Sequence, residues 1–132
     1  MLAAHPGTPA DPGHEIASAI HDAAKRERLA EPLLVSLAFN ESRFEPAQVN
    51  RRTRCAGVMQ IAPVHWRKKG IDPFPIRWNV MTGARILRTF IDKCGGDVER
   101  GVSAYGGRGC VPSAWAREVM RLAVVLDGRV SS

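Results

Sequence analysis

Apolar residues form two different helical patterns in the first third of this chain. Over residues 14–29 they recur at four-residue spacing and charged residues face elsewhere, which predicts an amphipathic helix on the surface. From Pro32 to about Ser42 they follow one another with hardly a polar interruption, which is typical of a buried helix. We expect this second helix to stop before Pro46, because the residue preceding a proline disfavours the α conformation.

Three further helices are predicted in the second half of the chain, separated by glycines. One is capped by Asn79 and stops at the paired glycines 95–96, and the next is capped by Asp97 and extends to residue 105. The last covers about residues 112–128. Residues 45–78 hold four prolines and short apolar runs, so we expect irregular structure there, with short helices or a small hairpin. The pattern predicts a mainly α fold with little or no β structure.

Length and composition are those of a single globular domain. The chain has 132 residues, of which 45% are hydrophobic and 24% charged, enough to bury a core. Residues 1–13, rich in proline and glycine, are predicted to be a flexible lead-in to a domain over residues 14–128. We expect no membrane insertion, since no apolar run approaches the length needed to cross a bilayer. A monomer is the default expectation.

The excess of basic residues favours a polyanionic partner. Lys and Arg outnumber Asp and Glu by 19 to 13, which gives a formal net charge of +6. Nucleic acid, anionic lipid and cell wall would all qualify. However, the arginines are spread along the chain and few aromatic residues are present to stack on bases, so we expect no nucleic-acid partner.

The three cysteines, Cys55, Cys94 and Cys110, show none of the close pairs that are typical of zinc sites. We therefore expect neither a metal nor another cofactor. Cys94 and Cys110 could pair in an oxidising compartment, and three reduced thiols are an equally good interpretation. The sequence leaves both open.

Glu41 occupies an unusual position, at the end of the predicted buried helix. Glutamates are rarely buried, and both burial and the negative end of a helix dipole disfavour the carboxylate. Both effects would raise the carboxyl pKa toward neutrality, as a general acid requires. The alternative is a glutamate that ends the helix in solvent, paired with Arg43.

Three short motifs follow one another in an informative order. Residues 41–46 read Glu-Ser-Arg-Phe-Glu-Pro, residues 57–61 read Gly-Val-Met-Gln-Ile, and residues 103–107 read Ser-Ala-Tyr-Gly-Gly. Together they resemble the catalytic domain of lytic transglycosylases related to goose-type lysozyme, over about residues 15–125, and in particular the small enzymes of phages and secretion systems. The resemblance implies a lysozyme-like fold and a peptidoglycan glycan strand as the partner.

The resemblance also implies which residues form the site. Glu41 is similar to the family's single acid and base, and Tyr105 to the tyrosine whose hydroxyl hydrogen-bonds that carboxyl. Substrate-binding positions are implied for four more residues: Ser42 near the scissile bond, and Gly57, Met59 and Gln60 along the cleft. A place in the core is the alternative for Met59 and for Tyr105.

The chain departs from the family pattern after this tyrosine. Gly106 stands where the family usually has asparagine, so an amide hydrogen bond is lost. Arg108 in the same loop either approaches a carboxylate of the substrate, on the muramyl group or the stem peptide, or is a solvated loop charge.

The reaction implied by the resemblance is cleavage of the MurNAc-β-1,4-GlcNAc bond with formation of 1,6-anhydro-MurNAc ends. Most glycosidases need two carboxyls, and only Glu41 has a recognisable motif here. A hydrolytic muramidase would need a second carboxylate from among Glu45, Asp72, Asp92 and Asp97. The other alternative is a catalytically inactive wall-binding or assembly protein.

The substrate implied by the resemblance places the protein at the cell wall, in the periplasm. No secretory signal is visible at the N-terminus, so we expect delivery in a phage virion, during phage lysis or through a secretion system.

Overall fold

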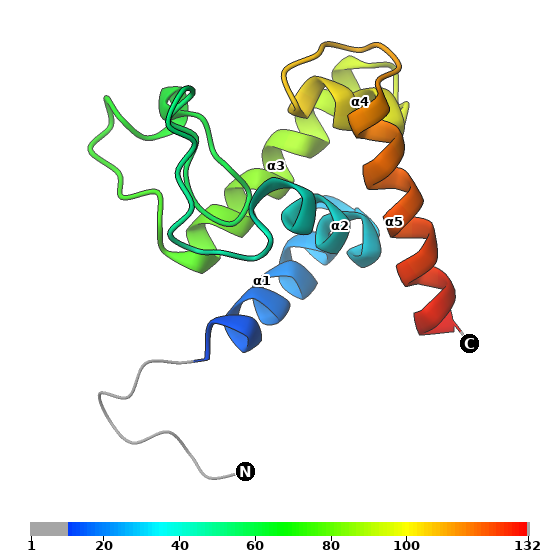
Figure 1. The fold of residues 1–132 in the computed structure, drawn as a ribbon, viewed down its shortest axis with the longest axis horizontal. Helices are drawn as coiled ribbons and strands as arrows, with labels where there is room; N and C mark the ends of the chain where they lie inside the picture. The colour runs from blue at the N-terminus through cyan, green and yellow to red at the C-terminus, as the bar shows by residue number, and fades with distance from the viewer. Residues whose placement is uncertain (1–10, 132) are drawn as a thin grey trace, which may run out of the picture.

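The computed structural model describes residues 11–131, with side chains to residue 128. This part of the chain forms five α-helices and a short 3-10 helix (Figure 1). The elements are α1 Pro12–Glu27, α2 Glu31–Ser42, η1 Pro63–His65, α3 Ile76–Lys93, α4 Val98–Tyr105 and α5 Ala114–Ser131. The expected mainly α fold is confirmed.

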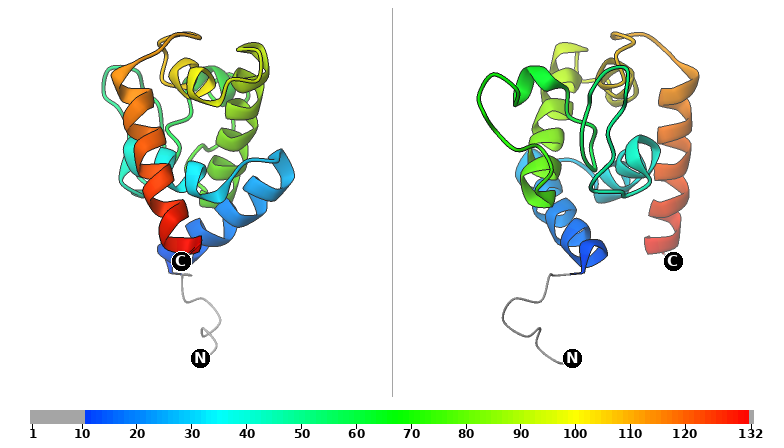
Figure 2. Two further views of the ribbon diagram at one scale, coloured as in Figure 1. Left: turned by 90° about the vertical axis from the view of Figure 1, so that its right-hand side faces the viewer. Right: turned by 60° about the vertical axis from the view of Figure 1, so that its left-hand side comes forward.

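Helix α2 lies at the centre of the molecule. Figure 1 shows the long segment 43–75 on one side of it and α5 on the other, and the two views of Figure 2 show the other helices arranged around it. It packs against α5 and α1, while α3 packs against α1 and α4. Leu34, Leu37 and Ala38 of α2 have no exposed surface, as the uninterrupted apolar run predicted.

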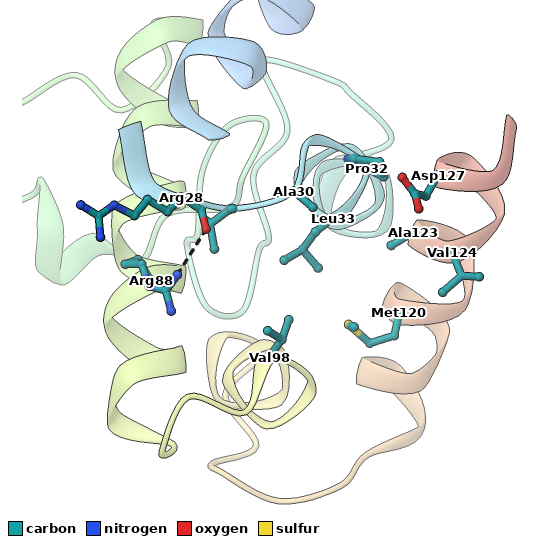
Figure 3. A pocket seen from close by; sticks show the side chains of 11 residues that line it. Arg28, Ala30, Pro32, Leu33, Arg88, Val98, Met120, Ala123, Val124 and Asp127 are labelled. Atoms are coloured by element: carbon teal, nitrogen blue, oxygen red, sulfur yellow. Dashed lines mark hydrogen bonds between the residues drawn. The ribbon is translucent and has the colours of Figure 1, made fainter. Parts of the chain in front are cut away.

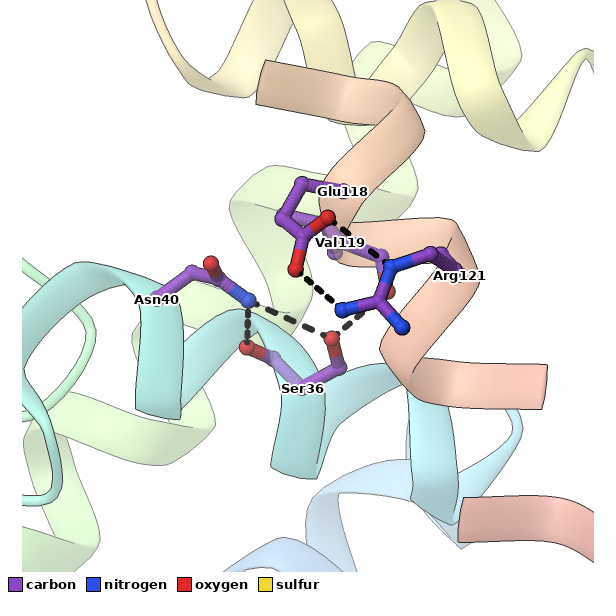
Figure 4. Close-up of polar contacts among 5 residues, drawn as sticks. All are labelled: Ser36, Asn40, Glu118, Val119 and Arg121. Carbon is purple, nitrogen blue, oxygen red and sulfur yellow. Dashed lines mark hydrogen bonds and ion pairs between the residues drawn. The ribbon is translucent and has the colours of Figure 1, made fainter. Parts of the chain in front are cut away.

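A buried hydrogen bond fixes α2 against α5 (Figure 4). The hydroxyl of Ser36 donates to the backbone oxygen of Val119 over 2.6 Å, and the amide of Asn40 donates to the backbone oxygen of Ser36 over 2.8 Å. The nearby ion pair between Glu118 and Arg121 is exposed, so it contributes little to stability. The turn of α2 that carries Glu41 is therefore held by buried contacts.

Helices α1, α3 and α5 have boundaries that differ from the predicted ones. Helix α1 begins at Pro12, so the last two residues of the predicted lead-in are helical, while residues 1–10 lie outside the described residues. Helix α5 begins at Ala114 and continues past Gly128. Helix α3 begins at Ile76, because Asn79 is not its cap but a fully buried residue of its first turn.

Segment 43–75 is largely irregular, as predicted for residues 45–78, except that residues 76–78 already belong to α3. Its described β structure consists of two isolated antiparallel bridges, Val49 with Ala56 and Ala56 with Ile61. Ile61 and Val58 are almost completely buried, so the segment packs on the helices through a few apolar side chains.

A disulfide joins Cys94, at the end of α3, to Cys110 in the loop after α4, with Cα atoms 5.4 Å apart. This structure thus contains the pair that the sequence left open. Cys55 is a free, half-buried thiol. None of the described helices combines the length and apolar character needed to cross a membrane.

Candidate active site

Glu41 lies in the last turn of α2 and faces a pocket of about 500 Å³. One part of the pocket wall comes from residues 50–62 and another from residues 105–108, with Trp115 of α5 as a further lining residue. The central helix therefore brings the candidate acid between two loops that are about fifty residues apart in sequence.

Removal from water dominates the electrostatics of Glu41. Burial raises the pKa of its carboxyl from 4.5 to about 8, and the positive charge of Arg108 opposes part of this rise. The carboxyl is therefore protonated at neutral pH and is able to donate a proton. The alternative of an exposed ion pair with Arg43 is wrong, because the Arg43 guanidinium lies over the Phe39 ring, 5.0 Å from its centroid.

Glu41 is the only carboxylate among the described residues that line the pocket. The four other acidic residues considered from sequence have local partners elsewhere. Glu45 accepts from the backbone of Ala47, Asp72 accepts from the backbone of Phe74, Asp92 pairs with Arg88, and Asp97 caps α4. Within the described pocket wall, a second carboxylate opposite Glu41 is absent.

Ser42 does not line the pocket. It is buried, and its hydroxyl contacts two backbone oxygens, that of Val58 over 2.7 Å and that of Ala38 over 3.2 Å. The structure therefore does not place Ser42 where the expected contact with substrate would need it. Ser42 instead ties the end of α2 to the segment that carries the second motif, and so positions Glu41 next to it.

Gly57 also differs from the expectation that its backbone approaches the sugar. It is buried with φ +83°, a conformation that favours glycine, and a Cβ there would lie 2.1 Å from the side-chain amide nitrogen of Asn79. The glycine is needed because Asn79 occupies the adjacent space.

Asn79 organises the second motif from inside the core. Its side-chain oxygen accepts from the backbone N–H of Met59 over 2.7 Å, and its amide donates to the backbone oxygens of Ala56 and Pro73 over 2.9 and 2.8 Å. These three bonds hold the middle of the irregular segment and its C-terminal end on α3. Sequence reasoning missed this because an asparagine before a helical pattern normally indicates a cap.

Met59 is a core residue and not an apolar wall of the cleft. Its side chain has no exposed surface and packs on Gly83 of α3, where a Cβ would lie 2.6 Å from that of Met59. Gly83 therefore allows the second motif to approach α3 closely. The cleft interpretation of the Met59 side chain is wrong, and the core alternative is correct.

Tyr105 lines the pocket together with Glu41, but its hydroxyl donates to the backbone oxygen of Met59 over 2.6 Å. Among the described residues this hydroxyl makes no hydrogen bond to the Glu41 carboxyl, so the expected contact is not formed in this structure. Burial and the neighbouring Glu41 raise the pKa of Tyr105 well above its usual value, so the hydroxyl keeps its proton. The bond joins α4 to the second motif across the site.

Gln60 is the residue of the second motif that reaches the pocket. Its side-chain nitrogen donates to the backbone oxygens of Gly57 and Gln48, over 3.0 and 3.1 Å. With the nitrogen used inside the protein, the side-chain oxygen is the atom that can accept from a sugar amide or hydroxyl. Of the residues expected to contact substrate, the structure places Gln60 and Tyr105 beside Glu41.

Sequence reasoning missed part of the pocket wall. Asn50 accepts from the backbone N–H groups of Arg52 and Thr53, which folds the chain into a tight turn at the pocket. Trp115 of α5 also lines the pocket, and the Arg108 guanidinium lies over its ring, 5.2 Å from the ring centroid. The Asn50 turn is local, so an asparagine in this loop could have indicated it, whereas the contact of Trp115 with Arg108 depends on packing between separate segments.

A second pocket, of about 340 Å³, lies between α2, α4 and α5 (Figure 3). Leu33, Val98 and Met120 point into it, and its carboxylate, Asp127, is exposed at the surface. This wall is mainly apolar and lacks a buried acid. Within residues 11–131, no three histidine, cysteine or acidic side chains are grouped as metal ligands would be.

A family model described as the Transglycosylase SLT domain matches residues 18–122, which is most of the chain. The match includes α2 with Glu41, the segment folded on Asn79, and α4 with Tyr105. The chain therefore belongs to the lytic transglycosylase family, whose lysozyme-like catalytic domain acts on peptidoglycan.

Proposed function

We propose that this protein cleaves the MurNAc-β-1,4-GlcNAc bond of peptidoglycan and leaves 1,6-anhydro-MurNAc ends, with Glu41 as its single acid and base. The observation that carries the proposal is one half-buried carboxyl, with a pKa raised to about 8, in a pocket whose described wall holds no second carboxylate. Such a site suits a reaction in which the substrate supplies its own nucleophile.

In the proposed reaction, Glu41 first donates its proton to the glycosidic oxygen, and the bond from that oxygen to the muramyl C1 breaks. The resulting carboxylate is stabilised by the nearby charge of Arg108. It then takes the proton of the muramyl C6 hydroxyl while that oxygen bonds to C1 and closes the anhydro ring. Glu41 ends the cycle protonated, and no water is consumed.

Glu41 is positioned by hydrogen bonds that neighbouring residues make. The Ser42 bond to Val58 and the Tyr105 bond to Met59 connect the two ends of the pocket to the second motif. We infer that Gln60, on the same wall, accepts a hydrogen bond from the substrate through its side-chain oxygen.

A hydrolytic muramidase of the same fold is the first alternative. It would need a carboxylate to activate water or to stabilise the positive sugar, and Glu45, Asp72, Asp92 and Asp97 all have partners outside the pocket. An inactive wall-binding protein is the second alternative. The burial of Glu41 argues against it, because a binding protein has no need of a carboxyl kept protonated at a cost in stability.

Mass spectrometry of the muropeptides released from purified peptidoglycan tests the proposal. Wild type should release anhydro-muramyl products, and Glu41→Gln, which keeps the shape but removes the titrating proton, should release none. Glu45→Gln, in the same motif but exposed, is the matched control and should act as wild type does. Reducing ends from wild type would instead indicate a hydrolase, and no release by any of the proteins would favour the binding alternative.

The disulfide agrees with action outside the reducing cytoplasm. Structural disulfides persist in the periplasm and at cell surfaces, where the glycan strand also lies. We propose that the protein works on the wall from the periplasmic side, as a single chain.

A further inference from the structure

Gly106, the departure from the family pattern, leaves space that two side chains occupy. A Cβ at this position would lie 2.7 Å from the Arg108 guanidinium and 2.7 Å from the Trp115 ring. The backbone at Gly106 has φ −75°, so the glycine is not required by its conformation. What it provides is room for Arg108 to lie against Trp115.

Two contacts hold the Arg108 side chain in this space. Its guanidinium carbon lies 5.2 Å from the centroid of the Trp115 ring, and Nη1 donates to the backbone oxygen of Gly106 over 3.0 Å. That bond uses one of five N–H donors, so the guanidinium retains donors for a ligand. Within residues 11–128, Arg108 has no carboxylate partner at ion-pair distance.

The pocket around Arg108 has a positive balance at neutral pH. Arg108 and Arg52 both line it, while its only described carboxyl, Glu41, is protonated. A pocket with two guanidinium groups and no anion attracts an anionic part of a substrate, and a planar guanidinium suits a carboxylate in particular.

We infer that Arg108, seated on Trp115 in the space left by Gly106, binds a carboxylate of the glycan substrate beside the bond that Glu41 acts on. The inference rests on the proposed function and names a specificity-determining residue for it. Two parts of peptidoglycan carry such a carboxylate, the lactyl group of muramic acid when its peptide has been removed, and the stem peptide when it is present. Neutral oligomers of N-acetylglucosamine carry neither.

Steady-state kinetics with two substrates test the inference and identify the carboxylate. Intact peptidoglycan and peptidoglycan stripped of its peptides by an amidase are digested by wild type, Arg108→Gln and Arg108→Lys. Arg108→Gln should raise KM about 10-fold or more, the usual effect of losing a charged hydrogen bond, with a smaller change in kcat. Arg108→Lys keeps the charge but not the planar pair of donors, so its KM should be intermediate. The exposed Arg117→Gln should leave both constants unchanged.

The substrate on which the loss occurs gives the source of the carboxylate. A loss on the stripped glycan identifies the lactyl group, whereas a loss confined to the intact material identifies the stem peptide. An unchanged KM for Arg108→Gln on both substrates would overturn the inference. Gly106→Ala adds only the Cβ that would meet Arg108 and Trp115, and should raise KM in the same direction.

A second readout separates loss of the Arg108 charge from general loosening of the loop. Because the charge of Arg108 lowers the pKa of Glu41, Arg108→Gln should shift the alkaline limb of the pH–rate profile upward, and Arg108→Lys should restore it. General loosening of the loop would not be corrected by lysine.

Binding measurements test the inference without requiring that the protein turns over substrate. In a Glu41→Gln background, calorimetry should show that stripped or intact glycan fragments bind more tightly than chitotetraose, and that Arg108→Gln removes this preference. If wild type released no product, the proposed function would fail, and the calorimetry would still decide the inference. Equal binding of the charged fragments and chitotetraose would refute it.

Discussion

The buried carboxyl of Glu41 imposes a cost on folding that can be measured. Burial raises its pKa from 4.5 to about 8. Between these two values the folded protein holds a proton that the unfolded chain has released, so the contribution of Glu41 to stability is highest below pH 4.5 and falls as pH rises toward 8. At about 1.4 kcal/mol per pKa unit, the cost at pH 7 is about 3 kcal/mol, with some relief from solvent at the pocket.

Glu41→Gln removes the titrating group and keeps the side-chain shape. We therefore expect the variant to be inactive and yet more stable than wild type, by about 1–3 kcal/mol at pH 7 and by well under 1 kcal/mol near pH 4.5. Urea unfolding followed by circular dichroism at half-unit steps from pH 4.5 to 8 measures both quantities.

The control for this series is Glu45→Gln, which removes an equal charge four residues away from an exposed position. It should leave the fall in stability between pH 4.5 and 8 as it is in wild type. If Glu41→Gln were no more stable than wild type at pH 7, or if its advantage did not shrink at low pH, the argument that Glu41 is protonated because it is buried would be wrong.

Three further predictions concern the acid, the second motif and the disulfide. Peptidoglycan turbidity assays should show activity falling above about pH 8, because Glu41 then loses the proton it donates. Gly57→Ala should destabilise the protein by about 3 kcal/mol or more in thermal unfolding, since its Cβ meets Asn79, whereas Gly70→Ala, also at positive φ but with open space, should cost only the conformational strain. Cys94→Ser should lower the free energy of unfolding by about 3 kcal/mol through loss of the cross-link, and the variant should no longer respond to reductant, unlike wild type.

Helices and the candidate acid were predictable from the sequence because their signals are local. The apolar run of α2 predicted a largely buried helix, and it places Glu41 at the end of that helix. The four prolines likewise indicated irregular structure over residues 45–78, most of which is irregular. The resemblance of three ordered motifs then predicted the family, which the match over residues 18–122 confirms.

The tertiary structure decided whether each motif residue has a structural role in the core or a place in the pocket. The sequence predicted cleft positions for Ser42, Gly57 and Met59. All three are buried, and they hold the second motif against α2 and α3. A motif shows which residue types occur together, but it does not predict whether their side chains face the cleft or the core. Burial depends on packing between segments far apart in the chain, which no local pattern encodes.

The hydrogen-bond partners of buried polar residues could not be predicted from the sequence either. Asn79 has the residue type of a helix cap, and Tyr105 matches a tyrosine expected to contact the acid, yet both bond to the backbone of the second motif. The sequence by itself determined the helices, the position of Glu41 and the family. Only the tertiary structure decided which polar atoms meet, because buried donors and acceptors must be satisfied by whatever the fold brings within reach.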